Sequence, residues 1–232
     1  MQDYHDYIIR FERPPTGFVG FRVYWFGRAY CSVWIDQIRL LEESLPSEGE
    51  QLKGAKVEGL AIDHAAPATL VWAGVYNWTY RIPDAIGGRC VWGAPPEAAS
   101  ALPKVDAMLF SEVMLGGMPP PKRLLVSEFV KAGGGLVLLG GVCGYGKSQV
   151  HISPLLADLL PVTTKGLWDL RKAPAGGLVV QPAAHRFRDL RWDAAPRVYY
   201  YHEVSLKEGT QVWLRGTAAA EGKPGEVPLL VA

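Results

Sequence analysis

Residues 133 to 148 decide the fold, and they read Gly-Gly-Gly-Leu-Val-Leu-Leu-Gly-Gly-Val-Cys-Gly-Tyr-Gly-Lys-Ser. The apolar run 136–139 lies between glycines and predicts one short buried strand that leads into a glycine turn. In α/β proteins, the turn after such a strand is where ligands bind and nucleophiles are placed. This turn carries Cys143, and it also matches the phosphate-loop pattern through Gly141, Gly146, Lys147 and Ser148. The same loop therefore allows two different functions, a cysteine nucleophile or a phosphate-binding loop.

The sequence on both sides of this loop alternates between short apolar strands and helices. A helix is predicted over 119–132, because three prolines open the segment and apolar residues follow at helical spacing. A second helix is predicted over 154–160. Short apolar strands that alternate with helices indicate a parallel sheet covered on both faces, so the predicted class is α/β. We expect the neighbouring strands of this sheet at residues 68–73, 107–110, 136–139 and 178–181.

The organisation of the chain changes near residue 45. Residues 1–45 contain apolar runs of strand length separated by turn residues, which predicts a short antiparallel β segment. Residues 46–54 are polar and rich in turn formers, which is typical of a linker. The predicted α/β domain occupies residues 55–232.

Composition excludes several classes of function. The 24 basic residues nearly balance the 23 acidic ones, so no global field attracts nucleic acid. No apolar run approaches the ~20 residues of a membrane span, and residues 1–10 lack the pattern of a signal peptide. The three cysteines are widely and irregularly spaced, which indicates neither a zinc site nor a disulfide framework. We therefore expect a soluble protein with no metal, no cofactor, no nucleic-acid partner and no membrane span.

Several segments together carry a resemblance to a known family. They are Val-Asp-Ala-Met-Leu-Phe-Ser-Glu at 105–112, the proline-led helix, the glycine-bounded strand before Cys143, and Pro-Leu-Leu-Ala-Asp-Leu-Leu-Pro-Val at 154–162. Residues 184–215 extend the pattern with His185, Trp192, the pair Tyr201-His202, and Gly209. In this order the segments are similar to the class I glutamine amidotransferase-like domain of bacterial multidomain proteins. The resemblance covers about residues 55–232.

The resemblance implies a flavodoxin-like, doubly wound sheet with its ligand crevice at the carboxyl ends of the strands. Ser111 and Glu112 follow a predicted strand at that end. A small-molecule or carbohydrate ligand is the partner that such a crevice suggests. The residues expected in the crevice are Ser111, Glu112, Gly141, Gly144, Tyr145 and His185.

The two ends of the chain suggest a longer parent protein. Ser-Val-Trp-Ile-Asp-Gln-Ile-Arg-Leu at 32–40 resembles the last strand of a carbohydrate-binding-type β-sandwich. Residues 228–232 read as a core strand without the return strand usual in the amidotransferase-like family. We therefore expect a fragment, truncated at its C-terminus, of a carbohydrate-related and extracytoplasmic bacterial protein whose other domains are its partners.

The catalytic residues of the family match this chain only in part. Cys143 stands where the nucleophile is expected, but Tyr145 replaces the second glycine of the Gly-x-Cys-x-Gly pattern. The histidine and glutamate normally come as His-x-Glu, whereas His202 and Glu203 are adjacent. Neighbouring side chains of a strand point to opposite faces, so these two cannot line one pocket without a bend. The favoured interpretation is an inactive binding or scaffolding module.

Two alternatives remain open. The first is an active cysteine-dependent amidotransferase or amidohydrolase that uses Cys143 with His202 and Glu203. The second is nucleotide binding at residues 141–148. A phosphate loop needs a helix that begins at its lysine, and Pro154 disfavours helix in the residue before it.

Overall fold

The computed structural model describes residues 46–62, 64–65, 67–73, 89–113, 115–140, 153–164, 170–218 and 226–232. The chain divides into two units, Met1–Ser44 and Leu45–Ala232, and every described residue belongs to the second unit. The antiparallel β segment expected over 1–45 lies outside the described residues.

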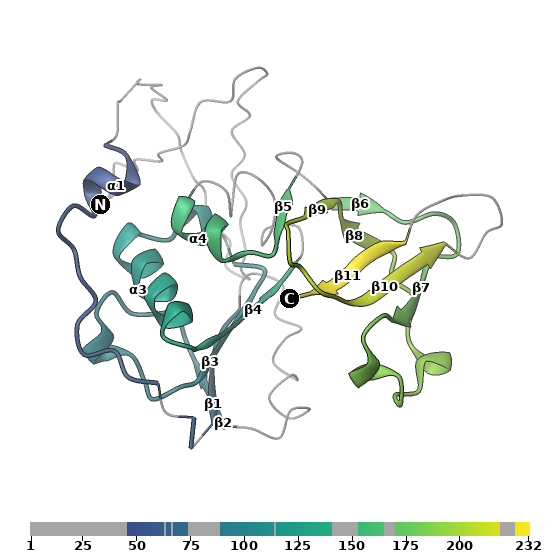
Figure 1. Cartoon of the computed structure of the whole chain (residues 1–232), viewed down its shortest axis with the longest axis horizontal. Helices are drawn as coiled ribbons and strands as arrows, with labels where there is room; N and C mark the ends of the chain where they lie inside the picture. Colours follow the sequence, from purple (N-terminus) through teal and green to yellow (C-terminus); the bar gives the residue numbers. More distant parts are fainter. Residues whose placement is uncertain are drawn as a thin grey trace, which may run out of the picture. The chain divides into compact units, whose positions relative to one another are not determined.

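A four-stranded parallel sheet forms the centre of the second unit (Figure 1). Its strands are β1 (Ala68–Ala73), β2 (Arg89–Trp92), β3 (Ala107–Ser111) and β4 (Gly135–Leu139), in the order β2-β1-β3-β4. Each neighbouring pair is parallel. This order is the one found in flavodoxin-like doubly wound sheets. The prediction of an α/β fold with a largely parallel sheet is confirmed.

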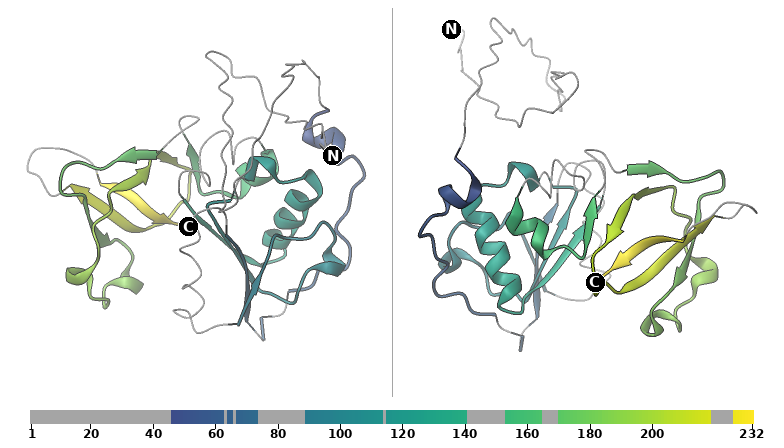
Figure 2. Two further views of the ribbon diagram at one scale, coloured as in Figure 1. Left: turned by 180° about the vertical axis from the view of Figure 1, so that it is seen from behind. Right: turned by 45° about the horizontal axis from the view of Figure 1, so that its top comes forward.

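Two helices cover the same face of this sheet in both views of Figure 2, namely α3 (Pro120–Lys131) and α4 (Pro154–Leu159). Both begin with proline, which suits the first helical turn because its N–H groups have no partner within the helix. Gly134 lies between α3 and β4, and a Cβ there would overlap the ring of Phe129. The buried core between helices and sheet includes Leu70, Met108, Phe110, Val126, Phe129 and Leu156.

A short helix, α1 (Glu48–Gln51), lies within the segment expected to be a linker. Ser47 caps it through a capping box with Glu50. The carboxylate of Glu48 accepts hydrogen bonds from Arg123 Nη1 at 2.9 Å and from Ser153 Oγ at 2.8 Å. Both partners are at or near the N-termini of α3 and α4, so this contact holds α1 to the helical layer.

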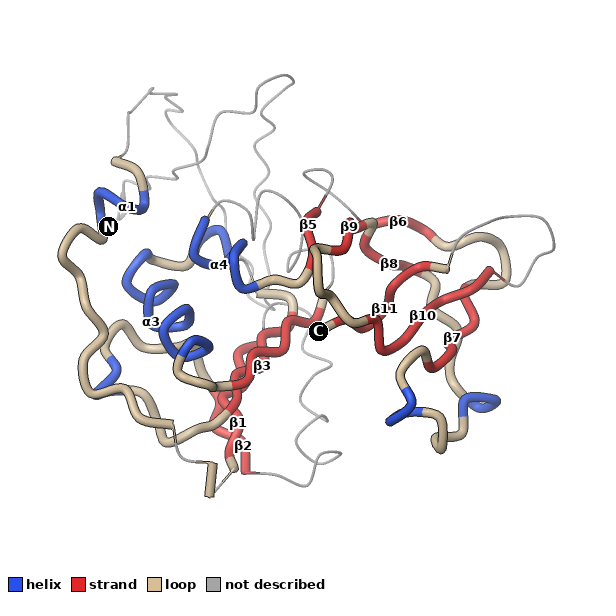
Figure 3. Tube along the Cα trace, in the orientation of Figure 1, coloured by secondary structure: helices blue, strands red, loops and turns tan. Residues whose placement is uncertain are grey.

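The remaining strands pair antiparallel, and Figure 3 draws them in red. One sheet has the order β11-β10-β7, with β7 (Leu178–Pro182), β10 (Val212–Ala218) and β11 (Val227–Val231). Two further pairs are β5 (Val162–Thr164) with β9 (Val204–Leu206), and β6 (Leu170–Lys172) with β8 (Tyr200–His202). Short 3-10 helices lie at Ala99–Ala101, Leu115–Gly117, His185–Phe187 and Trp192–Ala194.

The expectation that residues 178–181 join the parallel sheet is wrong. They form β7, which pairs antiparallel with β10. Burial does not separate the two cases, because β4 of the parallel sheet has exposed residues just as β7 exposes Gln181. The short apolar run alone did not distinguish these two environments.

Within the described residues, no helix is long and apolar enough to cross a membrane.

Candidate ligand-binding cleft

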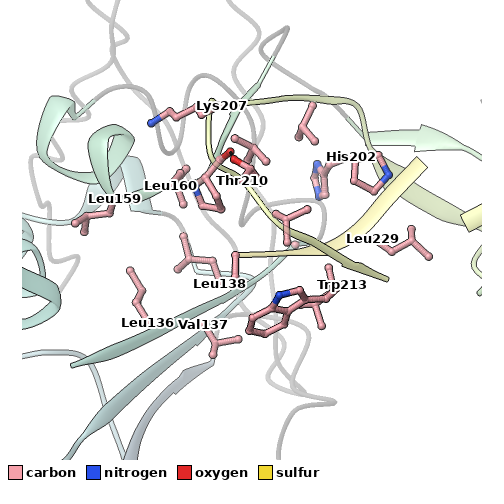
Figure 4. Close-up of a pocket in the computed structure, with 18 of the residues that line it drawn as sticks. Leu136, Val137, Leu138, Leu159, Leu160, His202, Lys207, Thr210, Trp213 and Leu229 are labelled. Atoms are coloured by element: carbon pink, nitrogen blue, oxygen red, sulfur yellow. Dashed lines mark hydrogen bonds between the residues drawn. The ribbon is translucent and has the colours of Figure 1, made fainter. Parts of the chain in front are cut away.

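A cleft of about 1090 Å³ lies along β4, from Gly135 to Leu138, and also includes Glu112 and Gly140, which follow the carboxyl ends of β3 and β4. We call it the strand-end cleft. Its lining comes from β4, from the segment between α4 and β5, and from β8, β10 and β11 (Figure 4). Most of the labelled side chains are apolar: Leu136, Val137, Leu138, Leu159, Leu160, Trp213 and Leu229. An apolar cavity with a few polar groups is the usual form of a small-molecule site.

The strand order explains why a site is expected here. The chain passes from β1 to β2 on one side, and then returns to place β3 and β4 on the other side of β1. Ligands of open α/β sheets bind outside the carboxyl ends of strands at such a reversal of direction. Ser111 ends β3 and pairs with both Ala73 and Leu139, which end β1 and β4. The residue that follows, Glu112, lines the strand-end cleft.

Glu112 has an unusual backbone conformation. Its φ is 52°, and no other described non-glycine residue has a positive φ. The left-handed conformation costs a residue with a Cβ about 1–2 kcal/mol, so the surrounding fold must hold it there. The side chain is buried at 8% exposure, although it reaches the cleft. Strain of this kind is concentrated at functional sites.

Ser111 supplies a second polar group at the same strand end. It is fully buried, and its Oγ has no hydrogen-bond partner among the described residues. Buried hydroxyls are normally paired, so this one marks a polar position inside an otherwise apolar core.

His202 ends β8 and lines the strand-end cleft. Its imidazole lies directly against Gly140, because a Cβ at Gly140 would be 2.6 Å from Cδ2 and 2.7 Å from Nε2 of His202. Gly140 follows β4, and the next residues in the sequence are Gly141, Val142 and Cys143. The fold therefore brings the imidazole to the start of the glycine turn.

Glu203 has a different environment. Its carboxylate forms a salt bridge with Arg171 Nε at 3.1 Å, and the side chains of both residues are about half exposed, 40% and 47%. Glu203 is not among the residues that line the strand-end cleft. The structure thus places His202 and Glu112 on one cleft and directs the Glu203 carboxylate to Arg171.

His185 begins a 3-10 helix and is not among the cleft-lining residues. The two residues after it contact Trp213: the guanidinium carbon of Arg186 lies 4.5 Å from the ring centroid of Trp213, and the Phe187 ring lies 5.9 Å away. Since Trp213 lines the cleft, the His185 segment supports its wall.

The other expected site residues, Cys143, Gly141, Gly144 and Tyr145, lie outside the described residues. One boundary of their loop is described. Ser153 is extended, with φ −117° and ψ 116°, and caps α4 through its hydroxyl. Helix α4 therefore begins at Pro154 and does not extend back through Ser153.

Sequence reasoning missed the far wall of the cleft. Lys207 Nζ donates to the carbonyl of Ala157 at 2.7 Å, and Thr210 Oγ1 donates to the carbonyl of Pro161 at 2.6 Å. These bonds hold the turn after β9 to helix α4 and to the segment between α4 and β5. Only the turn-forming Gly209 signalled this structure in the sequence, and it gave no indication of what the turn would contact.

No group of residues in the described part of the chain has the composition and spacing of a metal site.

Comparison with known proteins adds information about the fold. No protein-family model matches the chain, and no curated protein matches it. Two solved structures are similar. The cytoplasmic protein STM3548 from Salmonella typhimurium has a TM-score of 0.52 and 18% identity over 63% of this chain and 77% of its own. The cytoplasmic protein STM1381 from Salmonella typhimurium LT2 has a TM-score of 0.54 and 19% identity over 71% of this chain and 82% of its own. At this level of identity the similarity shows a shared α/β fold.

Proposed function

We propose that this chain is an amidotransferase-like binding module that holds a small-molecule ligand in the strand-end cleft without releasing ammonia from glutamine. The observation that carries the proposal is the cleft itself, about 1090 Å³ in volume, which runs along β4 and includes Glu112 and Gly140, the residues that follow the carboxyl ends of β3 and β4. It is mostly apolar and contains a buried carboxylate and an imidazole, the composition expected of a ligand site.

The surroundings of Glu203 argue against standard glutaminase chemistry. A glutamate that orients a catalytic histidine must accept a hydrogen bond from its ring. The carboxylate of Glu203 pairs with Arg171, and Glu203 is not among the residues that line the cleft with His202. This supports a binding role for the domain. The carbohydrate-related parent protein remains a prediction from the resemblance.

The binding proposal is tested by ligand-observed NMR with a library of small fragments. Leu229→Trp enlarges a residue that lines the cleft, and Leu190→Trp makes the same change at an exposed position that does not line it. We expect fragments that bind the natural chain to lose affinity for Leu229→Trp and to keep it for Leu190→Trp. Circular dichroism must show both variants folded. Equal binding by both variants would contradict a ligand site in this cleft.

A second proposal, an active cysteine-dependent amidohydrolase, is favoured by one observation. The His202 imidazole lies against Gly140, just before the turn that carries Cys143. A histidine beside a cysteine lowers the pKa of the thiol and speeds its alkylation. Iodoacetamide labelling at mildly acid pH, in a chain with Cys31 and Cys90 replaced by serine, separates the two proposals. Fast labelling of Cys143 that is lost in His202→Ala supports the hydrolase, and the rate of an ordinary thiol supports the binding module.

A further inference from the structure

Acidic side chains outnumber basic ones on the lining of the strand-end cleft. Three carboxylate side chains line it, those of Glu112, Asp158 and Glu208, against one lysine, Lys207. The Lys207 ammonium donates to the carbonyl of Ala157, so part of its hydrogen-bonding capacity is used within the fold. Among the described lining residues, negative charge is therefore in excess, and this arrangement disfavours a phosphate or carboxylate ligand.

Glu112 differs from the other two acids in burial and backbone. It is 8% exposed and has a left-handed φ of 52°, whereas Glu208 and Asp158 are both exposed. A carboxylate in an apolar surrounding interacts more strongly with an opposite charge than one in water does. Ser111, the residue before it, is fully buried and is not among the residues that line the cleft, so Glu112 is the polar group that this strand end presents to a ligand.

We propose that Glu112 is the anchor for a cationic nitrogen, an ammonium or guanidinium group, on a ligand whose apolar body fills the strand-end cleft. This inference rests on the proposed binding function and names the class of ligand. A carboxylate has about four lone-pair sites, so contacts within the protein leave capacity for a ligand donor. The apolar lining of β4 and β11 accepts the ligand body.

The experiment uses three molecules with the same linear apolar body and different head groups: hexylammonium, 1-hexanol and hexanoate. Dissociation constants are measured by NMR titration of the full chain at neutral pH. We expect hexylammonium to bind about tenfold more tightly than 1-hexanol, a factor that corresponds to about 1.4 kcal/mol, and hexanoate to bind most weakly. Hexanoate binding as tight as that of hexylammonium would overturn the proposal.

The variant Glu112→Gln keeps the shape of the side chain and removes its charge. It should abolish the preference for hexylammonium over 1-hexanol. The matched control Glu208→Gln removes a charge from the exposed rim of the same cleft and should keep most of the preference. A preference that survives Glu112→Gln, or that disappears equally in both variants, contradicts the role of Glu112.

A second measurement does not depend on the folding of Glu112→Gln. In the natural chain with ¹³C-labelled glutamate, hexylammonium should shift the carboxyl resonance of Glu112, and 1-hexanol should shift it much less. An unmoved Glu112 resonance at saturation overturns the inference. Equal binding of all three molecules would reject the cationic ligand and leave the binding function intact, whereas binding of none at millimolar concentration would contradict both.

Discussion

Replacing Gly140 with alanine tests the contact that joins the parallel sheet to the antiparallel strands at the cleft. A Cβ at this position would lie 2.6 Å from Cδ2 and 2.7 Å from Nε2 of His202. Real carbon contacts are not this short, so the imidazole must move or β8 must shift. Overpacking of this kind costs about 1–3 kcal/mol, and we expect Gly140→Ala to lower the free energy of unfolding by that amount.

A double-mutant cycle identifies the cause of this loss. In His202→Ala the ring is absent, so adding Gly140→Ala should cost little, and the coupling energy should account for most of the single-mutant effect. Gly117→Ala is the control, because a Cβ there meets nothing within 4 Å. Urea denaturation of the four chains and the control gives the free energies. An equal cost of Gly140→Ala with and without His202 would refute the contact.

Two further predictions concern α1. Glu48→Gln leaves the Arg123 guanidinium buried opposite a neutral partner, and since their side chains are only 8% and 10% exposed, we expect a loss of about 3 kcal/mol in urea denaturation. Glu128→Gln, which breaks an exposed salt bridge, should cost less than about 1 kcal/mol, and equal losses would contradict this account. The backbone N–H and hydroxyl of Ser47 lower the pKa of Glu50, so the capping box stabilises α1 above the ordinary glutamate pKa and loses this effect as the pH falls through the lowered value. An NMR titration should give Glu50 a pKa below the ordinary value in the natural chain and a higher one in Ser47→Ala, and no difference between them would exclude the capping interaction.

The sequence correctly predicted the strands and helices whose type can be read from their own residues. The runs that became β1, β3 and β4 are short and mostly apolar, and helix α3 has prolines at its start and apolar residues at helical spacing. The run 178–181 looked the same over four residues. Its antiparallel partner β10 lies far along the chain, so its sheet could not be derived from its own residues.

The residues of the candidate site, like the fold, could be predicted from the sequence only in part. Ser111 and Glu112 were expected at the crevice because they follow a strand, a local rule that needs no knowledge of the rest of the fold. No feature of the sequence predicted the left-handed φ of Glu112, since glutamate rarely adopts this backbone conformation. The approach of His202 to Gly140 depends on how β8 packs on β4, a contact between distant segments that no local pattern encodes.

The tryptophan indole signals of an NMR titration test the central claim most directly. Trp213 lines the strand-end cleft, whereas Trp92 is 48% exposed on β2 and does not line it. With hexylammonium added to the full chain, the account predicts that the Trp213 indole N–H signal shifts in a saturable manner and that the Trp92 signal does not. A saturable shift at Trp92 with Trp213 unmoved would contradict a ligand site in this cleft.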